Sequence, residues 1–301
     1  MSTPKVRIVD PSRADGPAAK IRAYVELTKP RIIELLLITT VPAMVLAAGG
    51  WPDTGLVVAT LIGGMLSSGG ANTINQVIDR DIDAVMRRTR GRPIPSGRVT
   101  APRALWFGIA LGLSGFLWLW STVNLLAATL STVALAFYVV VYSMYLKRST
   151  TQNIVIGGAA GAVPTLVGWA AVTGDLALPA WIMFAVVFFW TPPHFWALAL
   201  KYEGDYRSAG IPMLPVVVGR RRTLDQIVLY SIVVVGVSLL LIPVVPMGWI
   251  YSAAAVSLGV LLVAGALGTR RAPERAMTYF VFTNLYLAGL FVAVAVDRIV
   301  T

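Results

Sequence analysis

The stretch LLAATLSTVALAFYVVVYSMYL, from Leu125 to Leu146, carries no charged residue and ends directly at Lys147 and Arg148. A helix needs about 20 apolar residues to cross the hydrocarbon core of a bilayer, so this stretch predicts one membrane span. The chain shows none of the alternating strands of about ten residues that build a membrane barrel, so we predict an all-α bundle. Nine spans are predicted, near residues 32–50, 55–78, 104–121, 125–146, 153–172, 179–200, 225–245, 251–268 and 277–296.

The composition of the whole chain is that of a membrane protein. Of the 301 residues, 57% are hydrophobic and only 13% are charged, and the mean hydropathy is +0.75, far above that of soluble globular chains. Cysteine is absent, which excludes a disulfide framework and thiolate metal sites. We expect residues 1–23 to form a retained cytoplasmic arm, because they lack the apolar core of a secretory signal. Residues 24–301 are expected to form one intramembrane domain.

The net charge of +11 raises nucleic-acid binding as an alternative. The position of the charges argues against a nucleic-acid partner and for the lipid bilayer. Clustering of Lys and Arg in alternate connections is the positive-inside pattern, which places the N-terminus and these connections in the cytoplasm and the protein in the cell membrane. The 25 basic residues lie before residue 32, in the connections 79–103, 147–152, 201–224 and 269–276, and at Arg298.

Three polar residues, Asn75, Asp79 and Asp83, recur every four positions where the second predicted span ends. Residues with this spacing lie along one side of a helix. Their oxygen atoms suit Mg²⁺ held together with substrate phosphates, and acids beside a membrane segment are usually functional. A solvated helix end is the alternative interpretation. Asp81 points away from the row, so we expect it to pair with an arginine rather than to bind metal.

Basic residues follow this row. We expect the helix to continue for another turn through Arg87 and Arg88, with Arg92 in the turn before Pro93. Two interpretations are open for these groups: surface ion pairs of little energetic value, or a polyphosphate site in which guanidinium groups bind the oxygen atoms.

A second polar connection, 201–215, again combines acids and bases, among them Glu203, Asp205 and Arg207. By the charge pattern it faces the same compartment as the first. A pocket ringed by acids and bases over an apolar bundle suits a ligand with a charged head and a long apolar tail.

These motifs resemble those of the UbiA superfamily of intramembrane prenyltransferases. Within it the chain most resembles the branch that farnesylates haem, from Tyr24 to about Val296. The first signature is an Asn, an Asp four and eight residues later, and a run of Arg-Thr, Arg-Pro and Pro-Ser-Gly, here Asn75, Asp79, Asp83, Arg88-Thr89, Arg92-Pro93 and Pro95-Ser96-Gly97. Further stretches that carry the likeness are 146–150, 153–162, 193–196 and 205–215.

The resemblance implies transfer of a farnesyl group from farnesyl diphosphate to the 2-vinyl group of haem b (protohaem IX), which gives haem O. It implies Mg²⁺ as the cofactor, with Asp79 and Asp83 as the catalytic carboxylates. An insoluble product also favours direct transfer to a downstream haem A synthase. The metal ligands implied are Asn75, Asp79, Asp83 and Asp205, and the diphosphate contacts are Arg88, Arg92, Lys147, Arg148 and Lys201.

Two departures from the wider superfamily concern the metal. Gln76 stands where many members carry Asp. In the second connection many members carry two or three spaced Asp residues, whereas here only Asp205 aligns well and Lys201 lies near the place of another acid. The number of Mg²⁺ ions is therefore left open by the sequence.

His194 is the only histidine and follows Pro192-Pro193 inside a predicted span. It is either a packed core residue or a ligand of haem iron, for which imidazole is common. Two other functions are alternatives for the whole chain: a prenyltransferase for another aromatic acceptor, such as a quinone precursor, and a membrane transporter. A transporter places its charges near the midplane, whereas nearly all charges here lie at the predicted inner edge, which disfavours transport.

Overall fold

Helices account for every regular element in residues 16–301, the part of the chain that the computed structural model describes; for residues 31–37 it describes the backbone alone. Eight helices in this part are long and apolar enough to cross a membrane. The remaining predicted span, 32–50, is the first along the chain. It corresponds to α2 (Pro30–Ala48), whose described apolar part is Ile38–Ala48. The predicted all-α membrane bundle is confirmed.

Apart from α11, which begins before the predicted 225–245, the spans follow the predicted apolar runs closely. They are α3 (Thr54–Ile78), α5 (Ala101–Thr122), α6 (Leu125–Ala136) continued by the π-helix η2 (Phe137–Leu146) and α7 (Lys147–Ser149), α8 (Asn153–Thr173), α9 (Leu178–Lys201), α11 (Leu214–Leu239) with α12 (Leu241–Val244), α13 (Trp249–Arg271) and α14 (Ala276–Val300). Short helices outside the spans are α1 (Pro17–Thr28), α4 (Arg80–Val85), α10 (Glu203–Ser208) and the 3₁₀ turn η3 (Pro273–Arg275).

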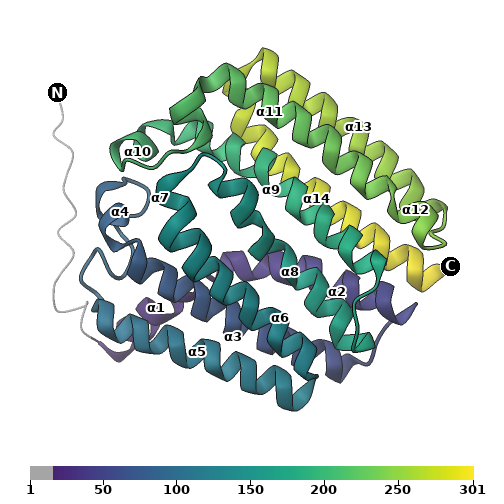
Figure 1. Cartoon of the computed structure of the whole chain (residues 1–301), viewed down its shortest axis with the longest axis horizontal. Coiled ribbons are helices and arrows are strands. Elements are labelled where there is room, and N and C mark those ends of the chain that lie inside the picture. Colours follow the sequence, from purple (N-terminus) through teal and green to yellow (C-terminus); the bar gives the residue numbers. More distant parts are fainter. Residues whose placement is uncertain (1–15) are drawn as a thin grey trace.

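The neighbours of each helix form a closed series. Contacts run from α3 through α5, α6, α8 and α9 to α11, α13 and α14, and return through α2 to α3. Figure 1 shows α4, α7 and α10 at one end of the bundle, and α12 and the C-terminus at the other. The two polar connections that the sequence singles out therefore lie at the same face of the molecule.

The N-terminal segment joins the fold earlier than expected. Residues 1–15 of the predicted arm lie outside the described residues, but α1 begins at Pro17 rather than near Tyr24. Ala23 and Leu27 are buried one helical turn apart and pack in a cluster with Val77 of α3. This apolar stripe holds α1 against α3, so the end of the arm belongs to the packed domain.

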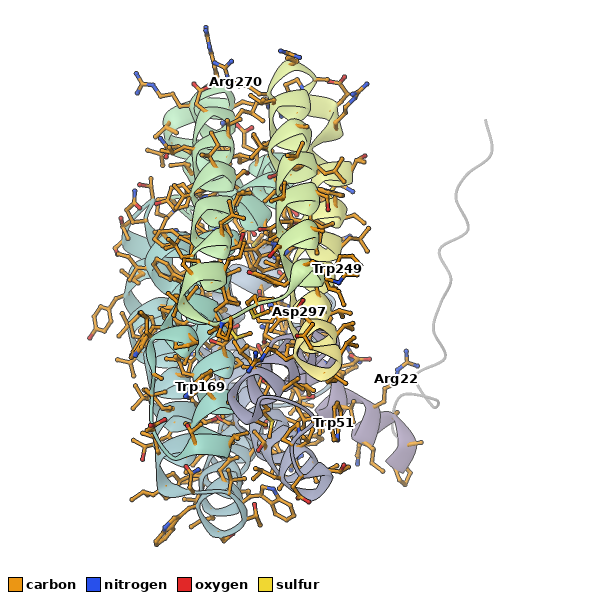
Figure 2. The ribbon with its side chains drawn as sticks, turned by 90° about the vertical axis from the view of Figure 1, so that its right-hand side faces the viewer. Arg22, Trp51, Trp169, Trp249, Arg270 and Asp297 are labelled. Atoms are coloured by element: carbon orange, nitrogen blue, oxygen red, sulfur yellow. The ribbon has the colours of Figure 1, made fainter. Side chains whose placement is uncertain are left out.

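The opposite face of the bundle is tied by a buried acid. Asp297, near the end of α14, is 0% exposed and accepts hydrogen bonds from the backbone N–H groups of Gly248 at 2.6 Å and Tyr251 at 3.0 Å. These donors belong to the first turn of α13, whose N–H groups have no partner within the helix. Figure 2 shows Asp297 beside Trp249 at this junction. Asp297 is therefore a helix cap supplied from a distant part of the chain.

Candidate active site

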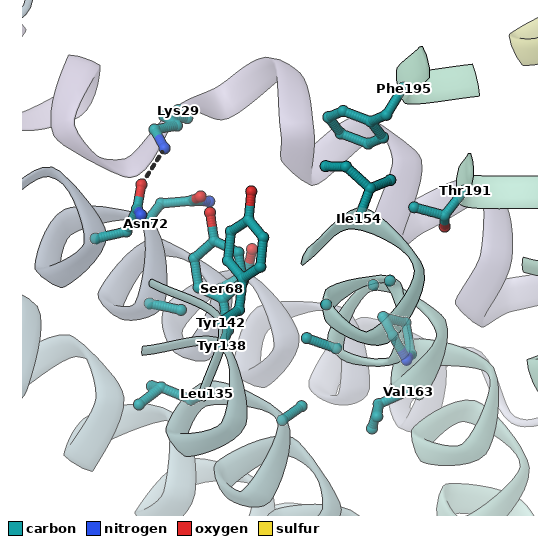
Figure 3. A pocket seen from close by; sticks show the side chains of 18 of the residues that line it. Lys29, Ser68, Asn72, Leu135, Tyr138, Tyr142, Ile154, Val163, Thr191 and Phe195 are labelled. Atoms are coloured by element: carbon teal, nitrogen blue, oxygen red, sulfur yellow. Dashed lines mark hydrogen bonds between the residues drawn. The ribbon is translucent and has the colours of Figure 1, made fainter. Parts of the chain in front are cut away.

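A cavity of about 350 Å³ lies between α2, α3, η2, α8 and α9. Figure 3 shows Lys29 and Asn72 on one side of it, and Leu135 and Val163 away from them. Its polar lining includes Lys29, Asn75, Asp83, Arg88, Arg92, Tyr138, Tyr142, Lys147 and Tyr206. Its apolar lining includes Leu135, Ile154, Val163, Val167, Trp190, Phe195 and Met213.

The predicted row of polar residues is present but is bent at Asp79. Helix α3 ends at Ile78 and α4 begins at Arg80, with Asp79 between them at φ −85° and ψ 6°. Backbone bonds still continue through the bend, because Asp79 N–H donates to the carbonyl of Asn75 at 2.9 Å and Asp83 N–H donates to that of Asp79 at 2.8 Å. The three side chains are at most 2% exposed. The row is therefore not a solvated helix end.

The expected extra helical turn through Arg87 and Arg88 is wrong. Helix α4 ends at Val85, and Met86 is extended at φ −77° and ψ 127°. Met86 is 2% exposed, so burial of its side chain turns the chain inward. The hydroxyl of Thr89 donates to the carbonyl of Asp83 at 3.1 Å and takes the place of the missing helical donor.

Asp79 is bound by residues from two other elements. Its Oδ2 accepts a hydrogen bond from Asn75 Nδ2 at 2.8 Å and forms an ion pair with Lys147 of α7. Its Oδ1 is buried and has no partner among the described residues. Asn75 and Lys147 both line the pocket, so Asp79 lies directly behind its charged wall.

Asp83 is bound to Arg92 from the loop that follows α4. One guanidinium nitrogen of Arg92 donates to both carboxylate oxygens of Asp83, at 2.9 Å and 2.7 Å. The Asp83 side chain is 2% exposed and that of Arg92 is 24% exposed. Both residues line the pocket. Asp83 and Asp79 therefore each face a cation of the protein itself.

Sequence reasoning missed Lys29, which precedes Pro30 at the edge of the membrane. Its Nζ donates to Asn75 Oδ1 at 2.9 Å, the bond drawn in Figure 3. Burial lowers the pKa of Lys29 to about 7, and the charge of Arg92 acts in the same direction. The backbone of Lys29 is left-handed, at φ 53° and ψ 66°, which is uncommon for a residue with a side chain. The sequence feature that could have singled out Lys29 is its position directly before Pro30, at the start of a predicted span.

The turn that carries Lys29 is held by side chains of α3. Gln76 Nε2 donates to the carbonyl of Leu27 at 2.7 Å, and Asn72 Nδ2 donates to that of Thr28 at 3.2 Å. An aspartate at position 76 has no proton to donate to Leu27 at neutral pH. The departure at Gln76 therefore has a structural reason: its amide fixes the junction between α1 and α2.

The π-helix η2 forms another wall of the pocket. The hydroxyl of Ser143 donates to the carbonyl of Tyr138, five residues earlier, at 2.9 Å and accepts from Asn75 Nδ2 at 2.9 Å. The rings of Tyr138 and Tyr142 stack with centroids 5.3 Å apart. Gly157 leaves room for this pair, since a Cβ there would lie 2.3 Å from the Tyr142 ring. Short π-helical segments are often found at functional sites. The sequence carries no marker that would predict one here.

Asp205 of the second connection lies outside the pocket lining. Its Oδ1 is 3.4 Å from Arg87 Nε, and its Oδ2 accepts from the backbone N–H of Arg88 at 3.4 Å. Within residues 16–301 no three acidic, His or Cys side chains lie close enough together to hold a metal. Asp205 therefore binds the segment that follows α4, while Asp79 binds Lys147 and Asp83 binds Arg92. The role of these acids and of Asn75 as metal ligands stays a prediction.

The predicted diphosphate contacts divide into two groups. Arg148 binds Asp81 through two nitrogens, at 2.8 Å and 2.7 Å, which confirms the expected arginine partner of Asp81. This bond lowers the pKa of Asp81 to about 2. Lys201 lies 5.7 Å from the ring of Tyr202 and, like Arg148, is not part of the pocket lining. The residues brought to the pocket are Arg88, Arg92 and Lys147.

His194 packs in the protein interior on α9. Its ring stacks between Trp190 and Phe280, with centroids 4.3 Å away on each side. Its Nδ1 lies 2.7 Å from the hydroxyl of Thr283 on α14. These are the contacts of a packed core histidine, and His194 is not among the residues that line the pocket. Its role as a ligand of haem iron stays a prediction.

A sequence profile of the UbiA prenyltransferase family matches residues 36–290. The chain belongs to this family. A Gloeobacter violaceus relative named Protoheme IX farnesyltransferase is 51% identical over 94% of this chain and 93% of its own length. A Mycobacterium avium relative of the same name is 49% identical over 95% of this chain and 93% of its own length. The predicted resemblance to the haem-farnesylating branch is confirmed. A Thermus thermophilus relative of that name is 53% identical over 93% of this chain; here the chain spans about half of the relative's length, 46%.

Solved structures of UbiA proteins share the fold. A structure of digeranylgeranylglyceryl phosphate synthase matches with a TM-score of 0.77 at 20% identity, over 93% of this chain and 99% of that one. A UbiA homolog from Archaeoglobus fulgidus bound to GPP and Mg²⁺ matches with a TM-score of 0.65 at 17% identity, over 91% and 99%. At these identities the likeness concerns the fold alone. Membership in the UbiA family and the eight apolar helices of the described residues together make the chain a multi-pass membrane protein.

Proposed function

We propose that this UbiA protein transfers the farnesyl group of farnesyl diphosphate to the vinyl group of haem b and forms haem O. The relatives named Protoheme IX farnesyltransferase support this, because two of them align over nearly their whole length. The observation that carries the proposal is one cavity that is lined both by Arg88, Arg92 and Lys147 and by a set of apolar side chains. The charged side chains suit a diphosphate, and the apolar ones suit a prenyl chain.

The oxygen atoms at the charged wall fit Mg²⁺ held together with a substrate. Asp79 Oδ1 is buried without a partner among the described residues, and Asn75 and Asp83 line the cavity beside it. Mg²⁺ commonly takes one or two protein carboxylates and completes its shell with water and substrate phosphates. We propose Asn75, Asp79 and Asp83 as its holders. When bound there, the ion neutralises charge on the diphosphate.

The residues of the pocket would promote departure of the diphosphate. Positive charge on Arg88, Arg92 and Lys147 is placed where negative charge grows as the bond between farnesyl carbon and phosphate oxygen breaks. The stacked faces of Tyr138 and Tyr142 line the same cavity, and an aromatic face stabilises a desolvated cation by up to about 2 kcal/mol. The haem vinyl group then attacks the allylic carbon, and water adds to the resulting cation with loss of a proton, which gives the hydroxyethylfarnesyl group.

The setting of the reaction follows from the charge pattern. We propose that the active site faces the cytoplasm from the cell membrane, within one intramembrane domain that extends the predicted residues 24–301 to the start of α1 at Pro17. The basic connections support this, since α4, α7 and α10 lie together at one end of the bundle (Figure 1). Transfer of the insoluble product to a haem A synthase is part of the same proposal. Membership in the UbiA family argues against the transporter alternative.

The test is a reaction of purified protein with labelled farnesyl diphosphate and haem b, with and without Mg²⁺. We expect diphosphate release that depends on haem and on Mg²⁺, and a haem product that carries the label. Release that depends on a quinone precursor instead of haem would favour the other aromatic acceptor. Absence of release with every acceptor would overturn the proposed function.

A further inference from the structure

The carboxylates proposed to hold Mg²⁺ are already bound to cations of the protein. Lys147 binds Asp79 and Arg92 binds Asp83, and the two acidic side chains are 0% and 2% exposed. Arg88 adds a third positive charge to the same cavity. Without a ligand the charged wall therefore carries more positive than negative charge, which favours an anion over a second cation.

We propose that Lys147 and Arg92 are positioning residues that keep Mg²⁺ from binding until a diphosphate arrives, so that metal and diphosphate bind interdependently. The proposal rests on the proposed function, because it uses the same diphosphate site. It adds an order of events that neither the residue types nor the family assignment implies.

Coulomb's law gives the reason for this order. A divalent cation that enters alone and binds both oxygens of Asp79 must displace Lys147 from Oδ2, and at Oδ1 alone it still lies beside the ammonium group. Like charges placed together in this way repel each other strongly in a buried site. A diphosphate removes this penalty, since it offers phosphate oxygens to Lys147 and Arg92 and frees the carboxylate oxygens. The buried Oδ1 of Asp79, which has no partner among the described residues, is then joined by a released Oδ2.

The chain supplies a matched control at the next position. Lys147 and Arg148 are neighbours in α7, and each binds one aspartate of the first connection. The Lys147–Asp79 pair is 16% and 0% exposed, whereas the Arg148–Asp81 pair is 38% and 62% exposed. Substitution at either position removes one positive charge from the same helix. Only Lys147 is expected to affect metal binding, because an exposed pair interacts weakly with its surroundings.

The experiment measures Mn²⁺ binding by electron paramagnetic resonance in detergent micelles, with and without inorganic pyrophosphate. A protein-free titration of the same Mn²⁺–pyrophosphate mixture is the blank. We expect pyrophosphate to tighten Mn²⁺ binding to the wild type by about 5- to 150-fold, and Mn²⁺ to tighten pyrophosphate binding by the same factor. In Lys147→Gln, Mn²⁺ alone should bind at least about tenfold tighter than in the wild type. Arg148→Gln should bind Mn²⁺ as the wild type does. The charge-conserving Lys147→Arg should still bind Mn²⁺ weakly in the absence of pyrophosphate.

The outcomes separate this inference from the proposed function. Equal Mn²⁺ affinity with and without pyrophosphate in the wild type would overturn the inference, even where farnesyl transfer to haem is measured. Equal tightening in Lys147→Gln and Arg148→Gln would overturn the role of Lys147. The paired titrations of the wild type need no variant, so they decide the question even where Lys147→Gln does not fold. If the wild type binds Mn²⁺ and pyrophosphate interdependently but transfers no farnesyl group to haem, the proposed acceptor is wrong and the inference stands.

Discussion

The first and second polar connections contain the same kinds of residues at the same face of the bundle, but only the first supplies acids to the pocket. Asp83 of the first connection lines the cavity, with Asp79 directly behind it. Of the second connection, the lining includes Tyr206 and Met213 but neither Glu203 nor Asp205.

The difference shows what turns a cluster of acids and bases into a site. In the first connection, α3 continues inward from the acids and lies beside the space that apolar residues line. In the second, Asp205 binds Arg87 and the backbone of Arg88, so α10 braces the first connection. A cluster of acids and bases at a membrane edge therefore identifies a candidate ligand site. Whether a ligand binds there depends on a cavity next to the cluster.

The largest effects should come from the acids of the first connection. Asp79→Ala and Asp83→Ala remove groups proposed to hold the metal, and each should lower haem-dependent diphosphate release by at least about 10²- to 10³-fold. Both variants should still insert in the membrane. Asp81→Ala is the matched control, because this side chain is exposed and bound to Arg148. Near-normal turnover in the Asp79 and Asp83 variants would break the comparison between the two connections.

A smaller effect is expected from the residue that departs from the wider superfamily. Gln76→Asp removes the donor to the Leu27 carbonyl and leaves a buried acceptor unpaired, which costs about 1–3 kcal/mol. We expect a lower melting temperature and a loss of activity through the displaced turn that carries Lys29. Gln76→Glu, of similar length and also without a donor, should behave alike. Unchanged stability in both variants would show that Gln76 does not hold this turn.

The spans could be predicted to within a few residues where hydropathy alone decides them. The predicted 153–172 and 179–200 correspond to Asn153–Thr173 and Leu178–Lys201. The prediction was late for 225–245, since α11 begins at Leu214. Gly219 interrupts α11 at φ 80° and ψ 167°, and the helix resumes with the Arg220–Arg222 run. Hydropathy reports neither the short segment before this break nor the charged turn after it.

The candidate site was predictable in its acids and less so in its cations. The spacing of Asn75, Asp79 and Asp83 is local, so the sequence reveals it. The place of Lys29 depends on hydrogen bonds from Gln76 and Asn72, more than 40 residues away. No local pattern distinguishes Lys147, which enters the pocket, from a neighbour that binds Asp81. Long-range packing decides these features.

Asp205 allows the comparison to be sharpened, because its two proposed roles predict different results. A metal ligand should lose activity and apparent Mg²⁺ affinity together in both Asp205→Asn and Asp205→Ala. A brace needs only an acceptor for the Arg88 N–H, which Asn retains. We therefore expect Asp205→Ala to lose about tenfold in turnover, equivalent to one hydrogen bond, and Asp205→Asn to lose less. Mg²⁺ titrations of both variants are the measurement, and a large shift in either would restore Asp205 to the metal site.

The smallest effect should come from Glu203, the other acid of the second connection. It binds Arg207 at 2.6 Å and Arg220 at 3.7 Å, and both arginine side chains are more than half exposed. Pairs of this kind contribute about 0.2–1 kcal/mol and are screened by salt. Glu203→Gln should therefore change turnover and Mg²⁺ dependence by less than about twofold. A loss comparable to that of Asp83→Ala would mean that the second connection supplies an acid to the reaction after all.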